Sequence, residues 1–181
     1  MSDDQFFHFC RKNEPYQIER NSLGEIIVME PTWSETGRCN FDIATELGIW
    51  NKQKKSGYAF DSSAGFTLPN SAIRAADAAF IKKERWNQIP TSERQKFTHI
   101  CPDFVIEIIS PSDSPFSVES KMKEWIDNGC QLAWMVNPKK RTTTIYRSNG
   151  DVIIKPFKEL LDGEDILPGF SINMATIFSP Y

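Results

Sequence analysis

The chain has 181 residues, of which 40% are hydrophobic and 25% are charged, and its formal net charge is −3 at pH 7. This composition excludes an intrinsically disordered chain, and the negative charge excludes attraction to nucleic acid through a global basic field. No apolar segment approaches the roughly 20 residues that span a bilayer, and the first residues lack a secretory signal, so we expect a cytoplasmic protein without a membrane partner.

The first half of the chain predicts a hairpin, a helix and two strands. Polar and apolar residues alternate on both sides of Leu23-Gly24, which is typical of an N-terminal β-hairpin. Apolar residues at helical spacing from about residue 36 to 55 predict a helix that ends at Gly57. These apolar positions are Phe41, Ile43, Ala44, Leu47 and Trp50. Two strand-like segments follow, at residues 60–70 and 73–83.

The second half predicts a central strand, a helix and further strands. Residues 102–110 are nearly continuous in Val, Ile and Phe, which predicts a strand covered on both faces. Ser114 as N-cap and Pro115 at the first helical position predict a helix that ends near Asn128-Gly129. Later strands are predicted at residues 132–136, 142–147 and 151–155, before a closing segment at 165–178.

This order of elements predicts an α/β or α+β fold in which helices flank a mixed β-sheet. A crossover helix joins the strand at 102–110 to the strand at 132–136, so we expect these two strands to be parallel. The sequence contains no internal repeat and no linker long enough to divide it. We therefore expect a single domain over residues 1–181.

Two carboxylates stand in unusually apolar surroundings. Glu107 lies in the middle of a β-branched strand, on the same face as Asp103, and Asp77 lies in the segment AADAAF. A buried carboxylate is costly unless it is paired, protonated or bound to a cation. If Asp77 and Glu107 converge from neighbouring strands, their oxygens suit Mg²⁺ or Mn²⁺ and metal-assisted hydrolysis. The alternative is that each acid pairs with an arginine or caps a loop, and both interpretations stay open.

Any metal site in this chain must use oxygen ligands. The four cysteines form no CxxC pair and only two histidines are present, which argues against zinc. Glu35, before the first helix, and Glu46, within it, are candidates for an additional carboxylate, with an ordinary surface position as the alternative for each.

Hydrolysis of a phosphate also needs a cation near the developing charge. The second helix offers two lysines, and its apolar stripe consists of Val118, Met122, Trp125 and Ile126. At about 100° per residue, Lys121 lies at the edge of that stripe and Lys123 points away from it. Lys121 is therefore the lysine that we expect to reach the sheet.

Several blocks of the sequence, taken together, resemble a known family. In chain order they are SSAGFTLPNSAIRAADAAFI, PDFVIEIISPSDS, SKMKEWIDNG, LAWMVNPKKRTTTIYR and ILPGF. They resemble the Uma family of restriction endonuclease-like proteins, which belongs to the PD-(D/E)XK nuclease superfamily. The resemblance covers about residues 24–170 and implies a restriction endonuclease-like core.

The resemblance also implies site residues. In the superfamily, an aspartate on the second core strand and an acid on the third bind a divalent metal, and these positions match Asp77 and Glu107. Ala76 stands where a proline usually precedes the aspartate, and Ile109 stands where the motif lysine would be. Uma-type sequences carry that lysine on the following helix, where Lys121 matches.

These observations predict a Mg²⁺- or Mn²⁺-dependent endonuclease acting on DNA. Asp77 and Glu107 would be metal ligands, Lys121 the catalytic cation and Asp103 a supporting acid. A homodimer would let such an enzyme reach both strands of a duplex. One alternative is a catalytically inactive binding or interaction protein that keeps the nuclease fold, and another is a glycosidase acid/base pair. A requirement for divalent metal distinguishes the three.

Overall fold

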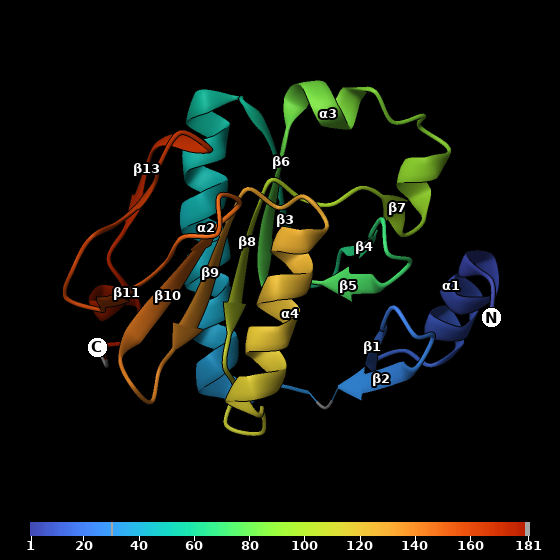
Figure 1. The fold of residues 1–181 in the computed structure, drawn as a ribbon, viewed down its shortest axis with the longest axis horizontal. Coiled ribbons are helices and arrows are strands. Elements are labelled where there is room, and N and C mark those ends of the chain that lie inside the picture. Colours follow the sequence, from blue (N-terminus) through green and yellow to red (C-terminus); the bar gives the residue numbers. More distant parts are fainter. Residues whose placement is uncertain (30, 180–181) are drawn as a thin grey trace.

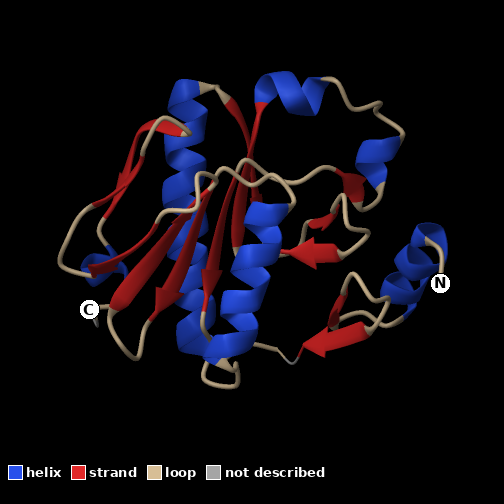
Figure 2. Ribbon diagram, in the orientation of Figure 1, coloured by secondary structure: helices blue, strands red, loops and turns tan. Residues whose placement is uncertain are grey.

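The computed structural model describes residues 1–29 and 31–179, which form a six-stranded mixed sheet between helices (Figures 1 and 2). Its strands, in chain order, are β3 (Gly57–Asp61), β6 (Ala78–Lys82), β8 (Phe104–Ile108), β9 (Leu132–Asn137), β10 (Thr142–Arg147) and β11 (Val152–Pro156). In space their order is β11-β10-β9-β8-β6-β3. Strands β8 and β9 are parallel and the other neighbours are antiparallel. The predicted fold class and the predicted parallel pair are both confirmed.

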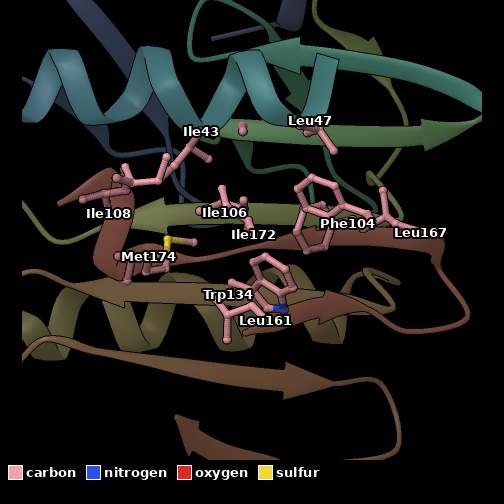
Figure 3. Close-up of a cluster of buried hydrophobic side chains, with 14 of the residues drawn as sticks. Ile43, Leu47, Phe104, Ile106, Ile108, Trp134, Leu161, Leu167, Ile172 and Met174 are labelled. Carbon is pink, nitrogen blue, oxygen red and sulfur yellow. The ribbon is translucent and has the colours of Figure 1, made fainter. Parts of the chain in front are cut away.

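Two helices cover the two faces of this sheet, α2 (Ser34–Lys54) on one and α4 (Pro115–Asp127) on the other (Figure 1). Ile43 and Leu47 of α2 pack in one core cluster with Phe104 and Ile106 of β8 (Figure 3). Val105, which points the opposite way, packs in a second cluster with residues of α4. Each such buried aliphatic or aromatic side chain contributes about 1.5–3 kcal/mol. Strand β8 is therefore fixed from both faces.

Helix α2 differs from its prediction in its apolar stripe and in its end. Its buried residues are Cys39, Ile43, Leu47 and Trp50, spaced by three or four positions. Phe41 is 71% exposed, because residues two positions apart on a helix do not face the same side. The helix ends at Lys54, and Lys55 caps it in the left-handed conformation with φ of 55°.

Gly57 begins β3 instead of ending the helix, and its lack of a side chain is required there. A Cβ at this position would lie 2.2 Å from the carbonyl oxygen of Ile81 and 2.5 Å from the ring of Phe80. We expect Gly57→Ala to lower the free energy of unfolding by about 1–3 kcal/mol, because the backbone of β6 has to move. Urea denaturation measures this change.

The matched control for this substitution is Gly48→Ala inside α2, where an added Cβ meets nothing within 4 Å. Alanine favours a helix by about 1 kcal/mol relative to glycine, so Gly48→Ala is expected to be neutral or stabilising. Equal stability of the two variants would contradict the close approach of β6 to Gly57.

A second sheet lies beside the first and contains the predicted N-terminal hairpin. Its spatial order is β2-β1-β5-β4-β7, and in chain order its strands are β1 (Gln17–Arg20), β2 (Ile26–Met29), β4 (Gly65–Thr67), β5 (Ile73–Ala75) and β7 (Thr98–His99). The strands β1 and β2 are antiparallel, as predicted. Each predicted strand at 60–70 and 73–83 divides between the two sheets, and the second divides at Ala76-Asp77.

The remaining elements are short. They are α1 (Asp3–Lys12), α3 (Lys83–Asn87), the 3₁₀ turn η1 (Glu93–Gln95), β12 (Leu161–Gly163), β13 (Leu167–Ile172) and α5 (Met174–Ile177). Helix α1 begins with a capping box between Ser2 and Gln5, and it buries only Phe6. Within the described residues, no helix is long and apolar enough to cross a membrane.

Candidate metal centre

Asp77 lies where the chain passes from β5 to β6, and both of its oxygens accept hydrogen bonds. The backbone N–H of Ile108 donates to Oδ2 at 2.6 Å, and Nδ2 of Asn40, on α2, donates to Oδ1 at 2.8 Å. Burial raises the pKa of Asp77, although these hydrogen bonds and the charge of Lys121 oppose the rise. The carboxylate is thus oriented by two neutral groups and is short of positive charge.

Glu107 lies on β8, and its side chain is on the face covered by α4. Nε1 of Trp125 donates to Oε1 at 2.8 Å, and Nζ of Lys121 lies 3.0 Å from Oε1 and 3.1 Å from Oε2. Burial raises the pKa of Glu107 to about 7; Lys121 opposes the rise, and the charge of Asp77 adds to it. This carboxylate is therefore costly to ionise in the protein alone.

The sheet brings these two acids together. The antiparallel register pairs Ala78 with Ile106, so the residue before Ala78 falls beside Glu107, and the amide that binds Asp77 belongs to the residue after Glu107. Asp77 and Glu107 interact electrostatically with each other and with Lys121. Asp77 is held by an amide and an asparagine, and Glu107 by a tryptophan and a lysine. The alternative in which each acid pairs with its own arginine is not the arrangement found.

Lys121 reaches the sheet from α4, as the helix geometry predicts, while Lys123 is exposed. The Nζ atom of Lys121 donates to the carbonyl oxygen of Ala75 at 2.8 Å and forms ion pairs with Glu107 and, at 2.8 Å, with Oε1 of Glu19. Burial alone would lower the pKa of Lys121, but the two carboxylates outweigh burial and raise it well above its usual value. The side chain is therefore a permanent cation.

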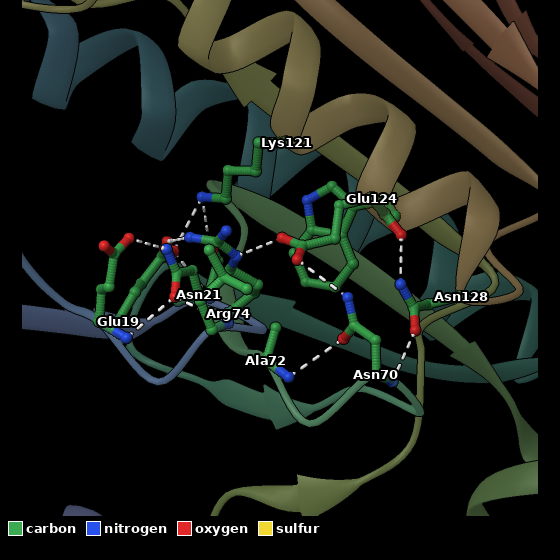
Figure 4. Close-up of polar contacts among 12 residues, drawn as sticks. Glu19, Asn21, Asn70, Ala72, Arg74, Lys121, Glu124 and Asn128 are labelled. Carbon is green, nitrogen blue, oxygen red and sulfur yellow. Dashed lines mark hydrogen bonds and ion pairs between the residues drawn. The ribbon is translucent and has the colours of Figure 1, made fainter.

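Glu19, on β1, is a member of this cluster that sequence reasoning missed (Figure 4). Only 3% of it is exposed, and besides Lys121 it binds NH1 of Arg74 at 2.9 Å and the backbone N–H of Ala75 at 3.0 Å. Burial would raise the pKa of Glu19, but Lys121 and Arg74 hold it below its usual value. In the sequence it looks like one more charged residue of an exposed hairpin, so no pattern singles it out.

The carboxylates of the cluster outnumber its cations by two, which favours the binding of a divalent cation. Its four carboxylates and two cations are Glu19, Asp77, Glu107, Glu124, Arg74 and Lys121. When all six are ionised, two negative charges remain uncompensated in largely buried surroundings. An unbalanced buried charge of this size is unfavourable without a cation.

The oxygen donors near Asp77 fit a hard cation such as Mg²⁺ or Mn²⁺. In the part of the chain that the structure describes, no three His, Cys, Asp or Glu side chains form a ready-made metal site. However, Oδ1 of Asn40 is buried without a hydrogen-bond partner in the described structure, and its Nδ2 binds Asp77. Two carboxylates and a neutral oxygen suit Mg²⁺, which keeps several waters among its ligands. Asn40 was not predicted, because an isolated asparagine in a helix carries no signal.

The three supporting candidates lie outside this cluster. Asp103 lies directly before β8, and four residues of extended chain separate it from Glu107 by roughly 13 Å. It binds instead the backbone N–H of Lys82 at 2.8 Å, Nε2 of Gln131 at 2.9 Å and NH1 of Arg85 at 3.0 Å. The expectation that Asp103 supports the metal pair is thus corrected, because strand alternation fixes the face and not the distance.

The other two candidates lie on the surface of α2. Glu35 is in the first turn of the helix and pairs with Arg38 at 2.6 Å, and Glu46 is exposed in the middle of the helix. Both residues are therefore exposed acids on the helix surface, which is the alternative stated for each from the sequence.

The comparisons with known proteins agree with the resemblance. The Uma2 family model, described as "Putative restriction endonuclease", matches residues 3–175. A crystal structure from Anabaena variabilis ATCC 29413, titled as a "putative nuclease belonging to DUF820", is similar with a TM-score of 0.79 and 20% sequence identity, over 98% of this chain and 97% of that chain. This likeness shows a shared fold. The comparison with curated proteins finds no match. Because the family model spans nearly the whole sequence, the chain belongs to the Uma2 family.

Proposed function

We propose that this protein is a Mg²⁺- or Mn²⁺-dependent endonuclease that hydrolyses phosphodiester bonds in DNA. The observation that carries the proposal is the juxtaposition of Asp77, Glu107 and the ammonium of Lys121 where β6 begins and β8 ends in the central sheet. Membership of a family described as a restriction endonuclease gives this cluster its most direct chemical interpretation. The fold alone would not assign this chemistry to the cluster, because one fold serves many functions.

The residues have distinct roles in this proposal. The carboxylates of Asp77 and Glu107 would hold the cation, and Asn40 orients Asp77 and offers a further oxygen. When bound, a divalent cation lowers the pKa of a water molecule and offsets charge on the phosphate. Lys121 supplies a fixed positive charge for the attacking water and for the phosphate oxygens in the transition state.

The helical origin of the lysine is compatible with this role. Ile109 leaves strand β8 without the motif lysine, yet Nζ of Lys121 lies 3.0 Å from Oε1 of Glu107. Phosphoryl transfer depends on where the charge lies more than on which backbone position carries it.

The direct test of the proposal is cleavage of supercoiled plasmid DNA by the full chain, with single-stranded DNA and RNA as parallel substrates. We expect nicked and then linear plasmid with Mg²⁺ or Mn²⁺, and no product when the metal is chelated. Binding of DNA without hydrolysis under any of these conditions would overturn the proposal in favour of the inactive nuclease-fold alternative. Cleavage that persists in excess chelator would overturn the metal requirement.

A second such centre would let the protein cleave both strands of a duplex in one encounter. We propose a homodimer as the simplest source of the second centre. Light scattering during size-exclusion chromatography measures the mass of the species in solution, and a monomer that still produces double-strand breaks in one encounter would contradict it.

A further inference from the structure

The ammonium of Lys121 contacts acceptors from both sheets. From β8, Glu107 accepts at 3.0 Å; from the second sheet, Oε1 of Glu19 and the carbonyl oxygen of Ala75 each accept at 2.8 Å. A lysine ammonium has three N–H donors, so these three partners use all of them. When Glu107 turns its oxygens to a cation, Glu19 and Ala75 remain to hold the lysine.

Glu19 is itself fixed on the side away from Lys121. Its Oε2 accepts from Arg74 at 2.9 Å, and Nε of Arg74 binds Oε2 of Glu124 at 2.5 Å (Figure 4). Glu124 and Lys121 lie one turn apart on the same helix, α4. The contacts therefore form a closed circuit of Lys121, Glu19, Arg74 and Glu124, which ties α4 to strands β1 and β5.

A lysine that comes from a helix needs such an anchor more than a lysine on the strand would. Its flexible four-carbon stem must cross from α4 to the sheet, and many rotamers would leave its ammonium away from Glu107. A fixed carboxylate that also binds the ammonium disfavours the rotamers in which Nζ lies away from Glu107. Glu19 supplies this carboxylate from β1, a strand of the second sheet.

We propose that Glu19 is a positioning residue for Lys121, so that the N-terminal hairpin is part of the catalytic apparatus. This inference rests on the proposed nuclease function and adds to it a residue that acts through the lysine. Glu19→Gln keeps the shape and an oxygen acceptor for Nζ and for the N–H of Ala75, but it removes the charge and places an NH₂ group against the donor NH1 of Arg74. We expect kcat to fall about 10- to 100-fold, the range expected from a displacement of about 1 Å, with KM and the Kd for Mn²⁺ nearly unchanged.

A readout without activity follows the lysine itself. Uniformly ¹⁵N-labelled protein should show the Lys121 ammonium by ¹H–¹⁵N correlation at neutral pH, because three acceptors and burial slow its exchange with water. The Lys121→Met variant identifies the signal by its loss. In Glu19→Gln we expect hydrogen exchange at least 10-fold faster, or a signal broadened beyond detection.

The matched control is Asp3→Asn, which also converts a carboxylate to a carboxamide. Asp3 pairs with Arg20, the residue next to Glu19 on β1. We expect Asp3→Asn to leave both kcat and the Lys121 signal as in the parent protein. If Glu19→Gln does not fold, Glu19→Asp replaces it; this variant keeps the charge but withdraws it by one methylene, and a smaller change in the same direction is expected.

An unchanged Lys121 signal in the Glu19 variant overturns the positioning role, as does an unchanged kcat where Lys121→Met is inactive. Equal effects of the Glu19 and Asp3 variants would assign Glu19 to stability alone. Should the parent protein cleave no nucleic acid with either metal, the proposed function fails, while the ammonium signal still decides whether Glu19 positions the lysine.

Discussion

Asp77→Asn is expected to lower the rate of metal-dependent DNA cleavage by about a thousandfold or more. The substitution keeps the size of the side chain but removes one of the two charges that would hold the cation, and it places an NH₂ group where both neighbours, Asn40 and the amide of Ile108, donate. Loss of a metal that contributes several kcal/mol to the transition state corresponds to this factor. Single-turnover cleavage at saturating Mg²⁺ and Mn²⁺ measures it.

Calorimetric titration with Mn²⁺ separates metal binding from chemistry, and we expect Asp77→Asn to weaken binding at least 10-fold. The control is Asp103→Asn, because Asp103 is a fully buried aspartate whose partners, Lys82, Gln131 and Arg85, lie far from the cluster. That variant is expected to lose stability and keep its affinity for Mn²⁺. Retention of full cleavage by Asp77→Asn would falsify the assignment of the metal centre.

Much of the fold is predictable because local patterns and long-range packing agree. The continuous apolar segment of β8 is buried on both faces, and the crossover through α4 makes β8 and β9 parallel. Prediction is weaker where a segment changes sheet. Residues 73–83 look like one strand, but the chain leaves the second sheet after Ala75 and enters the first at Ala78. Asp77 lies in that gap, which explains how an acid can sit between two apolar strands.

The candidate site is predictable only in part. Asp77 and Glu107 stand out as isolated charges among apolar neighbours, and Lys121 stands out by its place on the helix. Glu19 and Asn40 have no such signal, because each becomes part of the cluster only when elements distant in sequence come together. Asp103 shows the converse: its buried position is visible in the pattern, but its partners at the far end of β8 are not.

Lys121→Met is expected to reduce cleavage by about 100- to 1000-fold while the protein still binds Mn²⁺. The substitution keeps much of the length of the stem and removes the only charge that contacts both Glu107 and Glu19 in the described structure. Loss of one group that stabilises the charge of a transition state costs a factor of this size. Binding of Mn²⁺ should persist or become tighter, because Glu107 no longer has to leave an ammonium to reach the cation.

The substitution also leaves the buried Glu107 without a cation and leaves Glu19 with Arg74 alone, and breaking a buried ion pair costs about 3–5 kcal/mol. Cleavage is therefore measured below the unfolding transition of the variant, with the folded fraction determined by circular dichroism. Lys123→Met is the control, since Lys123 is two residues away on the same helix and exposed. If the two variants cleave at the same rate, Lys121 only compensates the charge of Glu107 and Glu19. If only Lys121→Met loses activity while it still binds Mn²⁺, Lys121 on α4 takes the catalytic role of the motif lysine, whose position Ile109 occupies.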